Sequence, residues 1–142
     1  MRYAPSQRSR RAASNEAKTR DTRQASLSLR VDFGAHGFLG PGKVRLMELI
    51  AEHGSISAAG KTMGMSYRRA WLLVDEINKI FRSPLVEKQM GGTGGGGAVL
   101  TKFGQDVVQR FRAIERETAA AVVSHLNAFK TALAPRPAGR EE

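Results

Sequence analysis

A run of four polar residues, Ser66-Tyr67-Arg68-Arg69, carries side chains that can bind nucleic acid. Arginine can donate two hydrogen bonds to the O6 and N7 atoms of guanine, and serine and tyrosine can reach phosphate oxygens. Two acids, Asp75 and Glu76, follow about two helical turns later. This separation of charge indicates a helix whose N-terminal end meets DNA. The competing interpretation of Arg68 and Arg69 is an ordinary solvated helix face.

Four further residues are candidate DNA ligands because of their positions around this run. Ser55 and Ser57 begin the preceding short segment, where a hydroxyl group can contact a phosphate. Lys88 precedes the glycine run Gly91–Gly97, which contains Thr93. A phosphate-binding P-loop would need Gly-Lys-Ser/Thr and then a helix, whereas Ala-Val-Leu follows here. We therefore interpret the run as the tip of a wing lying against the minor-groove backbone.

Residues for catalysis, metal binding or a cofactor are not indicated. His36, His53 and His125 are scattered, and no acid lies at metal-ligand spacing from them. Met63, Met65 and Met90 could form a soft metal site, but Met63 and Met65 flank a tight turn, where packing between helices is the simpler use. Cysteine is absent, which excludes disulfides and thiolate metal sites. We expect neither an enzyme nor a resident metal or cofactor.

Three helices are predicted to position the polar run. Apolar residues spaced three and four apart indicate a helix over Lys43–His53, which Gly54 ends. Either Ser55 or Ser57 can cap a second, short helix that runs to about Met63.

The turn to the third helix has its own signals. Gly64 supplies the turn, and Ser66 caps a helix from Tyr67 to about Arg82, where Ser83-Pro84 stops it. The small residues Ala58-Ala59-Gly60 allow the second and third helices to lie close together. Trp71 is either a core residue or a platform between helix and wing, and its large burial on folding favours the core.

The remaining pattern predicts strands and a long final helix. Alternation over residues 27–33 predicts a half-buried strand, which the Gly- and Pro-rich stretch 34–42 then breaks. Residues 85–90 and 98–100 form a hairpin around the glycine tip. Thr101 caps a helix whose apolar stripe continues to Leu133, a rod of about 45 Å. A single domain cannot cover that stripe, so we expect a dimer.

The predicted organisation has four parts. Residues 1–26 form a disordered basic arm, with seven basic and two acidic side chains in its first 24 residues. Residues 27–101 form a winged helix-turn-helix domain, 102–134 a long dimerisation helix, and 135–142 a disordered tail. The fold class is mainly α with a small β wing.

The charge balance indicates a polyanionic partner. The net charge is +10 and the calculated pI about 10.9, values that favour double-stranded DNA or an anionic membrane face over an uncharged partner. No apolar run approaches the roughly 20 residues of a membrane span, and the basic N-terminus leads into no apolar segment. We expect a cytoplasmic protein without membrane contact.

Two stretches, GSISAAGKTMGMSYRRAWLLVDEIN and LVEKQMGGTGGGGAVLTKFGQ, resemble the DNA-binding domain of ModE-type molybdenum-dependent transcription regulators. A more distant similarity extends to the N-terminal domain of LysR-type regulators. The resemblance implies a homodimer joined through the long helix, an inverted-repeat operator and molybdenum-related target genes. Members of the family append oxyanion-binding domains, and Thr93 stands where they often have a basic residue. Because of Thr93, we expect weaker contacts between the wing and DNA. Because the sequence ends at Glu142 without such domains, we expect no molybdate sensing, and any other effector is left open.

The leading prediction is a sequence-specific transcription regulator. The alternatives are a non-specific architectural DNA-binding protein and a DNA-binding subunit paired with a separate ligand-sensing chain.

Overall fold

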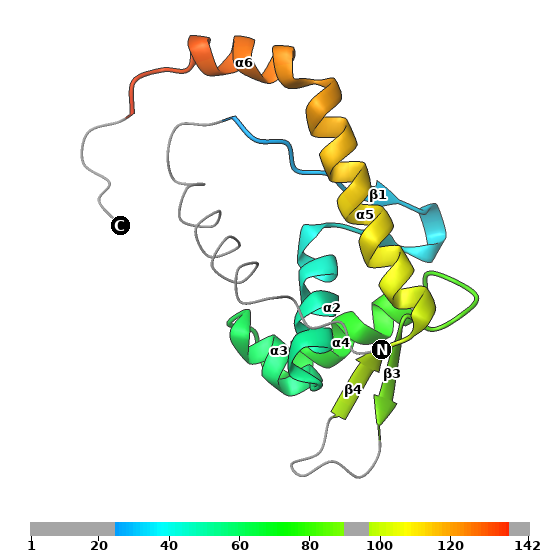
Figure 1. Cartoon of the computed structure of the whole chain (residues 1–142). Helices are drawn as coiled ribbons and strands as arrows, with labels where there is room; N and C mark the ends of the chain where they lie inside the picture. The colour runs from blue at the N-terminus through cyan, green and yellow to red at the C-terminus, as the bar shows by residue number, and fades with distance from the viewer. Residues whose placement is uncertain (1–24, 90–96, 137–142) are drawn as a thin grey trace.

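The computed structural model describes residues 25–89 and 97–136 (Figure 1). The predicted arm up to residue 24, the wing tip with Thr93, and the tail from residue 137 lie outside the described residues. The elements run in the order β1 (Val31–Asp32), η1 (a 3-10 turn, Gly34–His36), β2 (Phe38–Leu39), α2 (Pro41–His53), α3 (Ile56–Thr62), α4 (Tyr67–Asn78), β3 (Val86–Gln89), β4 (Gly97–Leu100), α5 (Lys102–Ala121) and α6 (Val123–Ala132).

Helix α2 begins two residues before the predicted start. Pro41 occupies the first helical turn, where a missing N–H leaves no bond unmade. The helix ends at His53 as predicted, and the Gly54 amide donates to the Ile50 carbonyl at 2.8 Å. Its buried side chains form the centre of the core.

The α3–turn–α4 unit follows the predicted local signals. Ser55, rather than Ser57, caps α3 by accepting a hydrogen bond from the Ala58 amide at 3.2 Å. Ser66 caps α4 in the same way. Gly64 has a φ of 71°, the left-handed conformation that suits glycine in a tight turn.

Close approach of α3 to α4 depends on Gly60. A Cβ atom at this position would lie 2.7 Å from the Cβ of Ala70. The prediction that small residues bring these two helices together is confirmed, with Gly60 as the residue that matters most.

Helix α4 ends at Asn78, four residues before the predicted end at Arg82. The Asn78 side chain accepts hydrogen bonds from the Leu85 and Val86 amides and donates to the Val86 carbonyl, all at 3.0 Å. These three bonds bring β3 back beside the end of α4, which requires the chain to leave the helix before Pro84.

The N-terminal strand is shorter than predicted. Only Val31–Asp32 is a strand, and it pairs antiparallel with Phe38–Leu39 inside the glycine-rich stretch that was expected to be a loop. Lys43, at the start of α2, holds this small hairpin. Its buried ammonium group donates to the Phe38 carbonyl at 3.1 Å and forms an ion pair with Glu76 at 3.3 Å.

The hairpin β3–β4, which we call the wing, is confirmed as an antiparallel pair. Val86 is opposite Leu100, and Gln89 is opposite Gly97. An isolated bridge joins Gly97 to Ser55, and the Ala98 amide donates to the Gly54 carbonyl at 3.0 Å. The end of the wing next to the glycine run is therefore attached to the start of α3.

The prediction of a single long C-terminal helix is wrong, because the structure has two helices there. Thr101 caps α5 as expected, but the helix ends at Ala121 and α6 restarts at Val123. Val122 between them has φ −110° and ψ 12°, which is outside helical geometry. Figure 1 shows α6, in orange, turned across the end of α5 that is remote from the wing.

Two adjoining clusters make up the core. The larger joins α2, α3, α4 and the wing, and the smaller joins the N-terminal hairpin to α2, to Ile80 just after α4, and to α5. Met63 and Met65 pack against the larger cluster, in agreement with their predicted packing role. The chain is a mainly helical winged helix-turn-helix protein.

Candidate nucleic-acid interface

The N-terminal end of α4 presents the predicted polar run to solvent. Ser66, Tyr67, Arg68 and Arg69 are all exposed, and Tyr67 retains 61% of its surface. The guanidinium groups of Arg68 and Arg69 form no hydrogen bond or ion pair with another described residue. The two strongest donors of the run are therefore available to a ligand at a helix N-terminus, where the dipole also favours an anion.

The serine hydroxyl groups have partly structural roles. Ser55 and Ser66 each accept a bond from a helix amide, and each hydroxyl keeps its own hydrogen available for donation. Ser57 lies half-buried within the first turn of α3. All three remain candidates for phosphate contacts.

Lys88 lies on the wing beside α4 and already has partners. Its ammonium nitrogen is 3.3 Å from an oxygen of Asp75 and 4.4 Å from the centre of the Trp71 ring. Sequence reasoning placed Asp75 away from DNA and missed this pair. The sequence did contain one signal: Trp71 and Asp75 are four residues apart and so share a helix face, where one cation can contact both.

Trp71 combines the two interpretations given to it. The side chain is half-buried and packs against the larger core cluster, while Lys88 lies over its ring. Tyr67, one turn earlier, has its ring centre 5.7 Å from that of Trp71. The indole therefore belongs to the edge of the core and also supports the wing.

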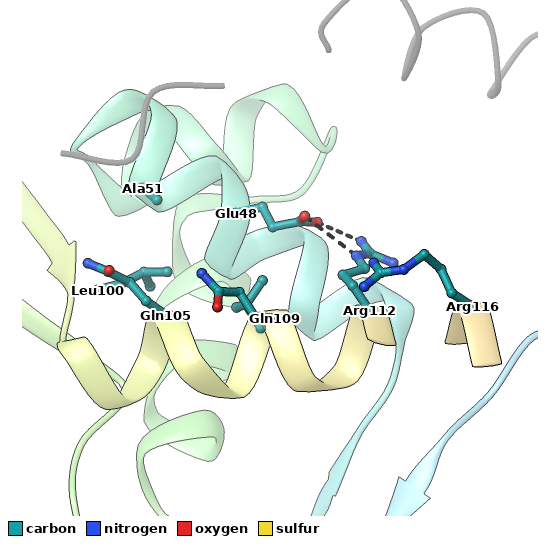
Figure 2. A pocket seen from close by; sticks show the side chains of 8 residues that line it. Glu48, Ala51, Leu100, Gln105, Gln109, Arg112 and Arg116 are labelled. Carbon is teal, nitrogen blue, oxygen red and sulfur yellow. Dashed lines mark hydrogen bonds and ion pairs between the residues drawn. The ribbon is translucent and has the colours of Figure 1, made fainter. Parts of the chain in front are cut away.

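A second feature is a pocket of about 360 Å³ between α2, β4 and α5 (Figure 2). Figure 2 shows Gln105, Gln109, Arg112 and Arg116 along α5 and Glu48 facing them from α2. Burial lowers the pKa of Arg112, but its hydrogen bonds to Glu48 and Glu115 outweigh burial and raise the pKa above its ordinary value. The Arg112 guanidinium thus remains charged and occupied by two carboxylates.

The described residues offer neither a metal site nor a membrane-spanning helix. No group of three or more histidine or acidic side chains in residues 25–89 and 97–136 could hold a metal ion. No helix in the same ranges is long and apolar enough to cross a membrane.

The sequence of the helix-turn-helix and wing matches a known protein family. Residues 42–105 match the family model described as bacterial regulatory helix-turn-helix protein, lysR family. This range begins in α2 and ends in the first turn of α5, so it contains both candidate DNA-binding helices and the wing.

Several individual proteins are similar in sequence to the same region of the chain. The DNA-binding transcriptional dual regulator ModE of Escherichia coli K12 is 41% identical over 88 residues, which cover 62% of this chain and 34% of that protein. The helix-turn-helix and wing of this chain are therefore similar to the DNA-binding region of ModE-type regulators. The molybdenum transport protein ModE of Azotobacter vinelandii is 40% identical over 93 residues, covering 66% of this chain and 34% of the relative. The molybdenum-pterin-binding protein MopA of Rhodobacter capsulatus is 42% identical over 77 residues, covering 54% and 29%.

The matched region is only part of these relatives. The match spans about a third of the length of the curated relatives. The recognised similarity therefore concerns the DNA-binding region.

Proposed function

We propose that this chain is a transcription regulator that recognises a specific operator in double-stranded DNA. The observation that carries the proposal is the pair of arginines, Arg68 and Arg69, exposed and without a described partner at the N-terminal end of α4. In a helix-turn-helix, the N-terminal end of the recognition helix enters the major groove and reads base edges, and α4 is that helix here. Ser55, Ser57 and Ser66 would contact phosphates, and Lys88 and Thr93 would add contacts from the wing.

We further propose that two copies bind together on an inverted repeat. Helix α6 and the residue that follows it expose large apolar side chains: Val123 retains 53% of its surface, Phe129 66% and Leu133 55%. Soluble monomers rarely expose such a group of side chains. Pairing with a symmetry mate would bury the group and place two α4 helices on one DNA duplex.

The proposed target genes are related to molybdenum. The names of two relatives, a molybdenum transport protein and a molybdenum-pterin-binding protein, support this choice. Similarity of the DNA-binding region favours a similar operator, because the residues that read bases lie in that region.

Selection from a random pool of duplex DNA tests the proposal directly. Repeated capture by the 142-residue chain should enrich one motif with two inverted half-sites, and footprinting should then protect that motif alone. Capture without enrichment, or uniform protection, would instead indicate an architectural protein that binds DNA through charge. Enrichment of a single half-site would contradict the dimer and leave sequence-specific binding standing.

A further inference from the structure

One face of α4 is directed at the wing. Tyr67, Trp71 and Asp75 follow each other at intervals of four and so share a helix face. Lys88 of β3 lies against that face, with its ammonium nitrogen 4.4 Å from the Trp71 ring centre and 3.3 Å from the Asp75 carboxylate. The wing cation is thus held between an aromatic ring and an acid, both on the proposed DNA-reading helix.

The indole of Trp71 has no polar anchor within the described residues. Its Nε1 atom is buried and has no hydrogen-bond partner there. Packing against the core on one side and Lys88 on the other therefore determine the position of the ring. The ring in turn offers a negative face on which an ammonium group is stable.

The Lys88–Asp75 pair is open to exchange. The Lys88 and Asp75 side chains retain 44% and 51% of their surface. Exposed ion pairs of this kind are weak, because water and salt screen both charges. A DNA phosphate that approaches the wing would offer Lys88 a competing anion.

We propose that Asp75 competes with DNA phosphate for Lys88 and thereby weakens the wing's hold on DNA of any sequence. Trp71 is the positioning surface that keeps the ammonium group within reach of both anions. This inference rests on the proposed function. Phosphate contacts carry no sequence information, so the competition lowers background binding and leaves discrimination to Arg68 and Arg69.

The variant D75N tests the competition, because it removes the charge and keeps the shape. E87Q is the matched control: it makes the same change in net charge, and Glu87 is an exposed neighbour of Lys88 on the same strand. Successive side chains of a strand point to opposite faces. We expect D75N to bind both the selected operator and random duplex about two- to fivefold more tightly than E87Q, a range set by the loss of one exposed ion pair.

The variant K88M shows whether the gain acts through Lys88. K88M alone should weaken binding and lower the slope of log K against log salt by about 0.9, the value for one phosphate contact. In the D75N/K88M double variant, the gain from D75N should vanish. A D75N variant that binds like E87Q, or a gain that persists without Lys88, would overturn the competition while the proposed function stands.

A measurement on the free protein separates the two proposals. The Trp71 ring current should shift the Lys88 Hε protons upfield in the NMR spectrum of the DNA-free chain. Unshifted protons in the free chain would overturn the inference. Failure of the chain to bind any duplex would overturn the proposed function, and with it the competition, even if the free-protein shift is observed.

Discussion

Two nitrogen atoms of the Arg112 guanidinium, on α5, donate hydrogen bonds to the Glu48 carboxylate on α2, at 3.4 Å from Nε and 2.5 Å from Nη2. The third nitrogen, Nη1, donates to Glu115 at 2.6 Å. The two residues are 64 positions apart, so the contact fixes the start of the proposed dimerisation region to the helix-turn-helix. All three side chains are more than two-thirds buried.

Glu48→Ala should lower the free energy of unfolding by about 1.5–3 kcal/mol, the range for hydrogen bonds to a charged group. Urea denaturation measures the change. Asp106→Ala is the control, since it breaks the exposed Lys102–Asp106 pair within α5, and such a pair contributes about 0.5 kcal/mol or less. Equal losses from the two variants would contradict a structural role for the Arg112–Glu48 contact.

Gly60→Ala should destabilise the fold by about 1–3 kcal/mol, because the added methyl group meets Ala70 and forces α3 away from α4. Thermal unfolding checks this result. Gly42→Ala provides the comparison, since a Cβ atom there has no neighbour within 4 Å. That helical replacement should be neutral or stabilising by up to about 1 kcal/mol. A Gly60→Ala chain as stable as Gly42→Ala would show that the helices can separate freely.

Features that depend on neighbouring residues could be predicted from the sequence. The three caps at Ser55, Ser66 and Thr101 and the turn at Gly64 each depend on a hydroxyl group or a missing side chain within three residues. The wing was predictable because strand residues flank a glycine run. Together these local signals gave the order of elements and hence the fold class.

Features that depend on distant contacts were missed. The end of α4 is set by bonds from Asn78 to residues of β3, and the N-terminal hairpin is held by Lys43, a charged side chain that became buried. The break at Val122 has no glycine or proline to signal it, and a valine only slightly lowers helix propensity. In the candidate site, the exposed arginines were predictable, whereas the Asp75–Lys88 pair required the structure.

Deletion of residues 1–24 should weaken DNA binding equally for all sequences. This segment has seven basic and two acidic side chains, and each phosphate contact adds about 0.9 to the slope of log K against log salt. Titrations at several salt concentrations, with operator and random duplex, measure both quantities. An unchanged slope would show that the segment does not meet DNA, and a loss confined to the operator would show that it reads bases.

Phe129→Ser combined with Leu133→Ser should convert a dimer into a monomer. The two side chains are the most exposed large apolar groups of the described residues at the C-terminal end of α6. Light scattering should give about 31 kDa for the unmodified chain, twice the 15.5 kDa of one copy, and half of that for the variant. Ala128→Ser, an exposed position on the same helix, should leave the dimer intact. A mass near 15.5 kDa for the unmodified chain would contradict the proposed dimer.

The central claim, that the N-terminal end of α4 reads bases, is tested most directly by the affinities of Arg68→Ala and Arg69→Ala for the selected operator and for a scrambled duplex. A base-contacting arginine contributes about 1–3 kcal/mol of discrimination. We therefore expect at least one variant to lose that amount on the operator and much less on the scrambled DNA. Arg110→Ala, which removes an exposed arginine from α5, should change both affinities little. Equal losses on the two duplexes, or no loss on the operator, would contradict the account.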